Sequence, residues 1–447
     1  MKKWFTNMLA VLLAVSMLAG CGGSSNGTNN SVSNDASGAD VETFVLFTGT
    51  KTEAQTEAFV KYILEPFEAA NPGIKVDWQP TANWDETLKI QMAGGEGPDL
   101  MDLNGPTDAI EYYESGRLLD LTPYAEEYGW IDRFYPWALN VCKTKDGVIT
   151  GLPTAYEGMM MWYNPELFEE NNWTYPETYE DFKAICADAK AKGLIPVAFG
   201  SSGFNRINEW WLSSAISSYS STEELNRLLK GELKFADPEI KGGFEEFLNC
   251  WNNGWISNSD SFAVSYEDAR SLFTQGRAPF IMEGTWYYQT LMDTGMDFGV
   301  ELLPPFKDGK TPVFPTAVSR IMAVNKDTEH KDAVLKFIDF MLTNEEAYIN
   351  STVIGNNQPL PINVDLREHT SEMEPKMAHI TNLMLDAQEE GNIGYCLWTF
   401  FPQNTRIYLY EKLDGVLLKE ISLEQYLEEA QAILDADIEQ GNVPSLE

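Results

Sequence analysis

Aromatic residues stand beside carboxylate side chains in several short segments of the chain. In "MEGTWYY", Glu283 and Trp286 follow a predicted strand and a glycine turn, and in "TAYEGMMMW" Tyr156 precedes Glu157. Aromatic rings bury the flat C–H faces of a sugar, and carboxylates form charge-assisted hydrogen bonds with its hydroxyl groups. These segments therefore predict contacts with a hydroxyl-rich molecule.

Further candidates come from the ends of predicted strands, where open α/β sheets bind their ligands. Trp398 stands in "YCLWTFF", among aromatic residues for which core packing is the alternative. Similarly, Trp286 could be a core residue at a helix start, Glu283 could cap backbone N–H groups, and Glu157 could be a surface carboxylate. The remaining predicted contacts are Thr48 in the loop Thr48-Gly49-Thr50, Asn104 and Asp108 in "NGPTD", Trp84, and Asn205 and Glu209 in "GFNRINEWW".

The elements that would position these residues alternate between strands and helices. "VETFVLFTGT" (41–50) reads as a buried strand, residues 53–70 place apolar side chains at helical spacing, and "IKVDW" alternates as a second strand. This order predicts an α/β sheet with parallel strands. The pattern recurs after residue 150, with helices predicted near 178–192, 240–252, 266–275, 330–349 and 422–440.

Size and charge limit the class of protein. About 400 residues follow the N-terminal segment, which exceeds the size at which a single core keeps growing, so two domains are expected. The net charge of −37 argues against nucleic acid or an anionic membrane surface as partners.

Cysteine and histidine usage predicts neither a metal nor a cofactor. The four cysteines of the body contain no CxxC pair, and their spacing suits no zinc site, although one disulfide of open pairing is possible. The three histidines lie in no motif, which argues against Ser-His-Asp chemistry. The residues concerned are Cys142, Cys186, Cys250, Cys396, His330, His369 and His379.

The N-terminus has the features of a targeting segment. Lys2 and Lys3 precede an apolar run that is too short to span a bilayer, as in a secretory signal peptide (1–20). Leu18-Ala19-Gly20-Cys21 resembles a bacterial lipobox, which implies that Cys21 carries diacylglycerol, and two acyl chains anchor a protein firmly. The Gly/Ser-rich segment that follows, through residue 40, is predicted to be a flexible tether.

Several segments resemble, in order, those of family 1 extracellular solute-binding proteins, the maltose-binding-like receptors of ABC importers. The match covers roughly residues 40–435. It includes "GEGPDLMDLN" (95–104), "GLPTAYEGMMMWYNPELFEENNW" (151–173), "PETYEDFKAICADAKAKG", "FTQGRAPFIMEGTWYYQ" (273–289) and "PTAVSRIMAVNKDTEHKDAVLKFIDFMLTNEEA".

The resemblance implies a two-lobed α/β protein of the periplasmic-binding-protein type II fold, with its ligand between the lobes. Lobe 1 is expected at 41–154 and about 311–362, and lobe 2 at about 155–310 and 363–447. In such proteins the residue matching Trp286 stacks on sugar, Glu157 matches a cleft glutamate at the lobe crossing, and Trp398 matches an aromatic that closes the cleft. "NGPTD" departs from the family, which often has an aromatic or acid there, and Trp84 could replace that platform.

The implied function is capture without catalysis. A lipid-anchored, monomeric receptor on the extracytoplasmic face of a bacterial membrane would close on a carbohydrate, preferably an oligosaccharide, and deliver it to ABC permease subunits. The chain itself has no P-loop pattern.

Three alternatives remain open from the sequence. A glycoside hydrolase would need two carboxylates across a scissile bond, and 68 acidic residues leave room for such a pair. The same fold could bind a cationic solute by cation–π contacts. It could also act as an adhesin or as a ligand sensor for a membrane kinase.

Overall fold

The computed structural model describes residues 41–204, 206–256 and 262–444. The predicted signal peptide, Cys21, the tether and Asn205 lie outside these residues. Within them, no helix combines the length and apolarity needed to cross a bilayer, and Cys142, Cys186, Cys250 and Cys396 are buried free thiols.

The first sheet has five strands in the order β2-β1-β3-β10-β4. β1 pairs in parallel with β2 and β3, as predicted, whereas β10 is antiparallel to β3 and β4. The strands are β1 (Glu42–Gly49), β2 (Ile74–Thr81), β3 (Leu100–Leu103), β4 (Leu152–Pro153) and β10 (Ile321–Val324).

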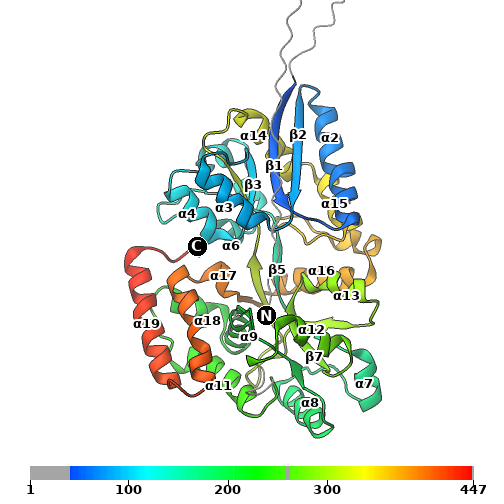
Figure 1. Cartoon of the computed structure of the whole chain (residues 1–447), viewed down its shortest axis with the longest axis vertical. Helices are drawn as coiled ribbons and strands as arrows, with labels where there is room; N and C mark the ends of the chain where they lie inside the picture. The colour runs from blue at the N-terminus through cyan, green and yellow to red at the C-terminus, as the bar shows by residue number, and fades with distance from the viewer. Residues whose placement is uncertain (1–40, 205, 257–261, 445–447) are drawn as a thin grey trace, which may run out of the picture. The chain divides into compact units, whose positions relative to one another are not determined.

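Helices pack on this sheet to form the first lobe, called lobe 1 below (Figure 1). The predicted helix over 53–70 is a continuous run of α1, a π-helical turn and α2, which begins with a capping box between Thr52 and Gln55. The helices are α1 (Glu53–Phe59), η1 (Val60–Leu64), α2 (Glu65–Ala70), α3 (Trp84–Gly94), α4 (Pro106–Glu114), α5 (Thr122–Glu127), η2 (Ile131–Arg133), α6 (Pro136–Asn140), α14 (Lys331–Thr343) and α15 (Glu345–Gly355).

The second sheet, in lobe 2, follows the order β11-β9-β5-β7-β6, with β8 also paired to β5. Its long strand β5 is antiparallel to β7, β8 and β9, so this sheet is mixed rather than parallel throughout. The strands are β5 (Tyr156–Tyr163), β6 (Val197–Ala198), β7 (Phe280–Gly284), β8 (Gly299–Glu301), β9 (Phe314–Val318) and β11 (Ile393–Tyr395).

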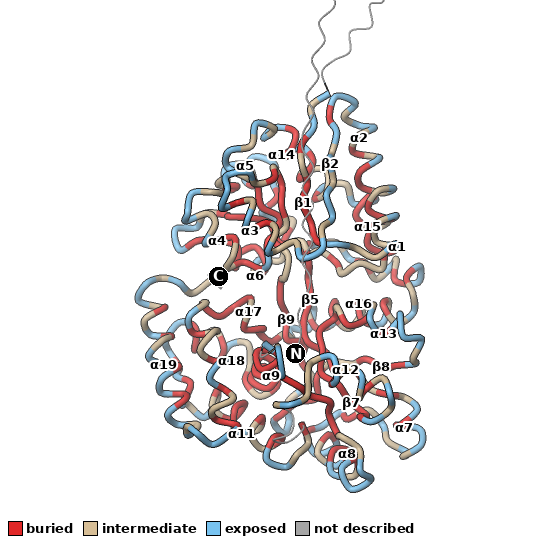
Figure 2. The backbone as a smooth tube through the Cα atoms, viewed as in Figure 1, coloured by how far each residue is buried: buried red, intermediate tan, exposed pale blue. Residues whose placement is uncertain are grey.

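A buried helix, α9, lies within the core of lobe 2 (Figure 2). It packs closely on α11, where a Cβ atom at Gly243 would lie 2.8 Å from the Ile216 Cα atom. The helices of lobe 2 are α7 (Pro165–Asn171), α8 (Tyr179–Ala191), α9 (Ile207–Tyr219), α10 (Thr222–Leu229), α11 (Pro238–Asn252), α12 (Tyr266–Thr274), α13 (Tyr287–Thr294), η4 (Arg367–Glu372), α16 (Pro375–Glu390), α17 (Leu397–Phe400), α18 (Gln403–Leu417) and α19 (Leu423–Gln440).

The chain passes between the two sheets more than once. It leaves the first sheet after β4 and enters the second at Tyr156. It returns between β9, which ends at Val318, and β10, which begins at Ile321. The return therefore lies at residues 319–320, a few residues after the expected position of about 311. The two-lobed α/β fold predicted from the sequence is confirmed.

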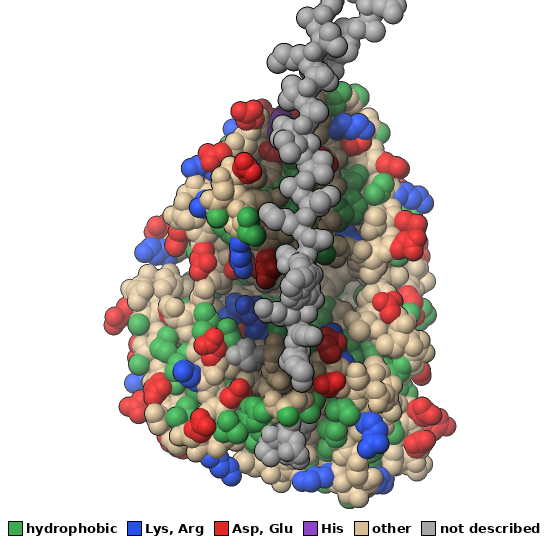
Figure 3. Space-filling model, in the orientation of Figure 1, with side chains coloured by type: hydrophobic (Ala, Val, Ile, Leu, Met, Phe, Trp, Pro, Cys, Tyr) green, Lys and Arg blue, Asp and Glu red, His purple; other side chains and the backbone are tan. Residues whose placement is uncertain are grey.

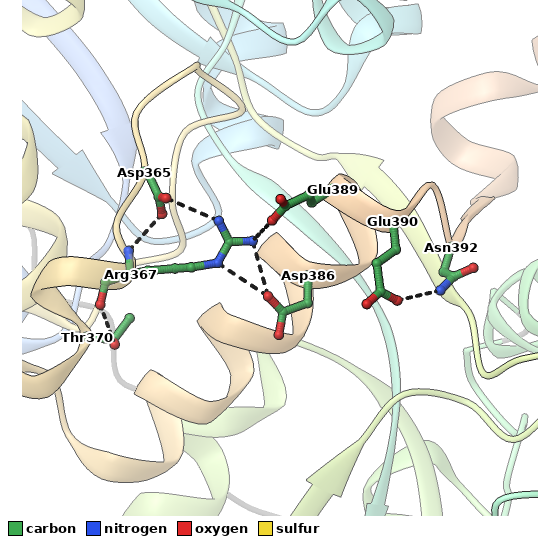
Figure 4. Close-up of polar contacts among 7 residues, drawn as sticks. All are labelled: Asp365, Arg367, Thr370, Asp386, Glu389, Glu390 and Asn392. Carbon is green, nitrogen blue, oxygen red and sulfur yellow. Dashed lines mark hydrogen bonds and ion pairs between the residues drawn. The ribbon is translucent and has the colours of Figure 1, made fainter.

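A third connection leads from α15 to α16 and is fixed by an arginine. Arg367 forms ion pairs of 3.1 Å with Asp365, 3.1 Å with Asp386 and 2.7 Å with Glu389 (Figure 4). The last two acids lie on α16, so the guanidinium attaches this connection to lobe 2. Because these acids are well exposed, each ion pair contributes little stability.

Acidic side chains are distributed over both lobes on the face shown in Figure 3. Such a distribution agrees with the strongly negative composition. It favours solubility without indicating a particular ligand.

Candidate ligand-binding cleft

A cavity of about 380 Å³ lies where the two lobes meet. Its lobe 1 wall comes from residues 48–52 at the end of β1, from Asp102 of β3 and from helices α1 and α15, and its lobe 2 wall includes residues 285–289 after β7. Strand ends therefore contribute to both walls, together with helices of lobe 1. Gln358, on the third connection, donates a 2.8 Å hydrogen bond to the Thr285 hydroxyl and joins the two sides.

Three charged side chains face this cavity from lobe 1 and the second crossing: Lys51, Asp102 and Arg320. Burial raises the pKa of Asp102, against the opposing charges of Arg320 and Lys51. Burial also lowers the pKa of Lys51, although the charge of Asp102 opposes that shift. Arg320 Nη1 has no hydrogen-bond partner among the described residues. The cluster therefore offers donors and an acceptor to a polar ligand.

Trp84, at the start of α3, lies against this cluster. The Arg320 guanidinium lies 4.2 Å from the centroid of the Trp84 ring. A Cβ atom at Gly49 would approach Trp84 Cδ1 to 2.8 Å and Arg320 Nη2 to 3.5 Å, so the contact needs glycine at that position. A tryptophan from α3 and an arginine from the second crossing thus meet beside Gly49, at the edge of the cavity.

Glu157 lies at the first crossing, in the second position of β5. Its side chain is 5% exposed, and the Ser319 and Trp398 side chains and the charge of Arg320 favour its ionised form. Burial raises its pKa from 4.5 to about 7 in spite of these favourable partners. The structure therefore places Glu157 at the first crossing as a mostly covered carboxyl group that does not line the cavity.

Trp286 is the N-cap residue of α13 and lines the cavity. Its ring centroid lies 6.1 Å from that of Trp398 on α17. Both rings are partly exposed, and of these two predicted residues, which the structure brings together, only Trp286 lines the cavity.

Glu283 is fully buried behind Trp286. Its carboxylate accepts hydrogen bonds from Arg270 Nε at 2.9 Å and from the Tyr266 hydroxyl at 3.2 Å. Burial raises the pKa of Glu283, while the charge of Arg270 and hydrogen bonds from Arg270, Tyr266 and Trp286 oppose the shift. Glu283 thus supports the wall of the cleft and is not on its surface, unlike the sequence expectation.

Tyr156 and Glu209 are also core residues, each 1% exposed. The Tyr156 ring packs against the rings of Tyr135, Trp137 and Phe314. Glu209 on α9 forms an ion pair with Arg406 on α18. Neither side chain lines the cavity, because each is enclosed by partners from distant parts of the chain.

Thr48 lines the cavity, with its hydroxyl accepting a 2.9 Å hydrogen bond from Trp78 Nε1. Asn104 and Asp108 do not line it: Asn104 is exposed after β3, and Asp108 lies on α4. Burial, together with the charge of Asp85 and against that of Lys89, raises the pKa of Asp108 from 3.8 to about 6.

Sequence reasoning missed Lys51, Asp102, Arg320 and Gln358. A signal was present for two of them, because Asp102 interrupts the apolar strand "LMDL" and Arg320 precedes the apolar strand "IMAV". The described residues contain no group of three or more His, Cys, Asp or Glu side chains arranged to hold a metal ion.

Two α/β lobes joined by several crossings, with polar and aromatic groups lining the space between them, define a two-lobed ligand-binding protein. The chain belongs to the bacterial extracellular solute-binding protein family, whose model matches residues 49–348. The resemblance predicted from the ordered segments is thereby confirmed.

Curated relatives include sugar-binding proteins. The chain is 27% identical to the maltotriose-binding protein of Pyrococcus abyssi, over 64% of this chain and 59% of that protein. It is 23% identical to the alpha-glucosides-binding periplasmic protein of Rhizobium meliloti (65% and 67%) and 23% identical to the multiple sugar-binding protein of Streptococcus mutans (65% and 69%).

Solved structures share the fold. A chitin oligosaccharide binding protein has a TM-score of 0.66 at 24% identity, covering 88% of this chain and 98% of its own. An ABC substrate-binding protein from Listeria monocytogenes in complex with cycloalternan has a TM-score of 0.66 at 22% identity, covering 90% and 100%.

Proposed function

We propose that this protein is the extracytoplasmic solute-binding receptor of an ABC importer and captures a carbohydrate, preferably an oligosaccharide. The observation that carries the proposal is the cavity lined from both lobes, where Trp286 faces the charged side chains of Lys51, Asp102 and Arg320. Aromatic rings that can stack on the faces of a sugar and charged groups that can bind its hydroxyls therefore line the same cavity. The names of the curated relatives support the same ligand class.

Capture follows from differential binding. A ligand that contacts both walls binds the closed arrangement of the lobes more tightly than an open one, and so shifts the population toward closure. Three crossings, with the hinge residues Ser319 and Arg320 between β9 and β10, provide short segments where such a motion can occur. The closed receptor would then deliver its ligand to membrane permease subunits, and separate subunits would hydrolyse ATP.

Anchoring would come from Cys21, outside the described residues. The lipobox-like segment before it supports attachment of diacylglycerol on the outer face of a bacterial membrane. Mass spectrometry of the protein purified from membranes would show a lipid-modified Cys21, and an unmodified, soluble product would contradict this part of the proposal.

Ligand binding is tested by thermal unfolding with malto-, chito- and xylo-oligosaccharides, because a ligand that binds only the folded state raises Tm. A sugar that raises Tm should then bind saturably by calorimetry, cause compaction in small-angle scattering and be recovered intact. The absence of binding across the panel would reject the carbohydrate assignment. Turnover of the sugar would instead favour the hydrolase alternative.

A further inference from the structure

The balance of charge in the cavity differs from that of the whole chain. The protein contains 31 basic and 68 acidic residues. Of the three charged residues described along the cavity, however, Lys51 and Arg320 are basic and only Asp102 is acidic. The other polar side chains that line it are neutral amides, hydroxyls and an indole. A strongly acidic protein thus presents a net positive charge inside its cleft.

Neither basic side chain is paired directly with a carboxylate among the described residues. Asp102 influences Lys51 and Arg320 through its charge, without a hydrogen bond to either. Both cations lie over aromatic rings instead. The Lys51 Nζ atom lies 5.7 Å from the centroid of the Phe59 ring, and the Arg320 guanidinium lies 4.2 Å from that of Trp84. A ring attracts a cation but does not neutralise it.

The arginines in the interior of lobe 2 are neutralised in a different way. Arg270 forms a 2.9 Å ion pair with buried Glu283, and Arg406 forms an ion pair with buried Glu209. Such pairing is expected, because an unpaired buried charge is costly. Arg320 differs, since its Nη1 atom is buried and has no hydrogen-bond partner among the described residues. What Arg320 lacks is an acceptor, and a negatively charged acceptor would suit it best.

The acids nearest to these cations supply only part of the missing negative charge. Burial raises the pKa of Asp102, and it raises the pKa of Glu157 at the first crossing to about 7. Each is therefore ionised less readily than an exposed carboxyl group. Burial also lowers the pKa of Lys51, and an anion beside the ammonium group would oppose that shift. The cleft is thus electrostatically incomplete without an added anion.

We propose that the carbohydrate captured by this cleft is acidic and that its carboxylate binds to Lys51 and Arg320. This inference rests on the proposed function and adds the charge of the ligand to it. A planar guanidinium can donate two parallel hydrogen bonds to a carboxylate, and an ammonium group adds a compact positive charge. The neutral amides and hydroxyls of the wall then remain for the sugar hydroxyls, and Trp286 remains for the face of a sugar ring.

Calorimetric titration with matched pairs of sugars tests the proposal, because the members of each pair differ in a carboxylate. One pair is maltotriose and maltotriose with its terminal C6 hydroxymethyl group oxidised to a carboxylate. The other is xylotriose without and with a glucuronic acid branch. Hydrogen bonds between charged groups are about twice as strong as neutral ones. We therefore expect the acidic member of at least one pair to bind about ten- to a hundredfold more tightly than the neutral member.

Variants show whether the two cations cause this preference. Lys51→Gln and Arg320→Gln each remove a positive charge and should lower the ratio of acidic to neutral affinity at least about fivefold. Trp286→Ala removes a ring from the cavity but no charge, so both members of a pair should bind more weakly by the same factor. Lys61→Gln is the matched control. Exposed Lys61 also lies over a ring, 4.8 Å from the centroid of Tyr62, but does not line the cavity, so both affinities should be unchanged.

The outcomes separate this proposal from the proposed function. Circular dichroism establishes that each variant is folded, and Lys51→Gln carries the test if Arg320→Gln does not fold. Equal affinity for the acidic and neutral members of both pairs would overturn the acidic ligand and leave the proposed function intact. The same conclusion would follow if Lys51→Gln changed the affinity ratio no more than Lys61→Gln. Failure of the wild type to bind these sugars and the wider panel would reject both.

Discussion

The ring centroids of Trp286 and Trp398 lie 6.1 Å apart, and each side chain acts on a different buried carboxyl group. Trp286 opposes the rise that burial causes in the pKa of Glu283, and Trp398 opposes the corresponding rise in the pKa of Glu157. The two acids lie on the paired strands β5 and β7 but are not opposite one another, because Glu283 pairs with Met160, and Glu157 pairs with Ala317 of β9. Two carboxyl groups that the sequence suggested as ligand contacts are thus buried, and each interacts with one of the two tryptophans.

The first prediction concerns Glu283→Gln. This change removes the buried charge that pairs with Arg270 and leaves the largely buried guanidinium only its 3.6 Å ion pair with the exposed Glu267, so we expect a loss of about 3 kcal/mol in the free energy of unfolding. Chemical denaturation measures it. Glu180→Gln serves as the matched control, because Glu180 pairs with Lys183 on the surface and its loss should cost less than about 1 kcal/mol. Equal effects of the two variants would contradict a supporting role for Glu283.

The second prediction concerns pH. Burial raises the pKa of Glu157 from 4.5 to about 7, so between these values the folded protein binds this proton and the unfolded chain does not. The contribution of Glu157 is therefore most favourable at or below pH 4.5 and falls as pH rises to about 7, with a slope of up to about 1.4 kcal/mol per pH unit. Above pH 7 the contribution is constant.

Glu157→Gln isolates this effect, because glutamine does not titrate. We expect the unfolding free energy of the wild type, relative to that of the variant, to fall by about 3 kcal/mol as the pH rises from 4.5 to 7. Urea denaturation of both proteins from about pH 4.5 to 8 measures this difference. Other buried acids, such as Glu209, titrate in both proteins and cancel. A difference that does not vary with pH would show that the Glu157 pKa is not raised.

The general fold was predictable because strand and helix periodicities are local signals. The position of the second crossing was harder to predict, since "FPTAV" and "IMAV" are both apolar strand sequences separated only by Ser319 and Arg320. Nothing in either sequence indicates that one strand belongs to the second sheet and the other to the first. That difference depends on pairing with β5 and β3, which are far away in the chain.

The site was predictable in part for the same reason. An aromatic residue after a strand and a glycine turn is a local pattern. This pattern indicated Trp286, which lines the cavity. Whether a nearby acid is free depends on remote partners: Glu209 pairs with Arg406, 197 residues away. The contribution of Trp286 to binding stays a prediction that the titrations above test.

The third prediction concerns Arg320→Lys. Lysine keeps the positive charge but loses the planar group that stacks on Trp84 and the free Nη1 donor. We expect sugar affinity to fall about tenfold, measured by calorimetry, with little change in Tm. Arg367→Lys is the control, because Arg367 binds exposed acids on the third connection (Figure 4) and does not line the cavity. Equal losses in the two variants would remove Arg320 from the binding site.

The last prediction concerns Gly49→Ala. The added methyl group would lie 2.8 Å from Trp84 Cδ1, so the tryptophan must move away from Arg320. Because overpacking costs about 1–3 kcal/mol, we expect a lower Tm together with weaker sugar binding.

Gly73→Ala is the control that separates the steric clash expected at position 49 from the general effect of replacing a glycine by alanine. No atom lies within 4 Å of a Cβ at Gly73, and its φ is outside the left-handed region. A compatible Gly-to-Ala change stabilises by about 0.4–1 kcal/mol through the unfolded chain. Gly73→Ala should therefore raise Tm slightly and leave sugar affinity unchanged. If Gly49→Ala behaved in the same way, the Trp84–Arg320 contact would not depend on the glycine, and Trp84 would have room to rearrange without affecting the cleft.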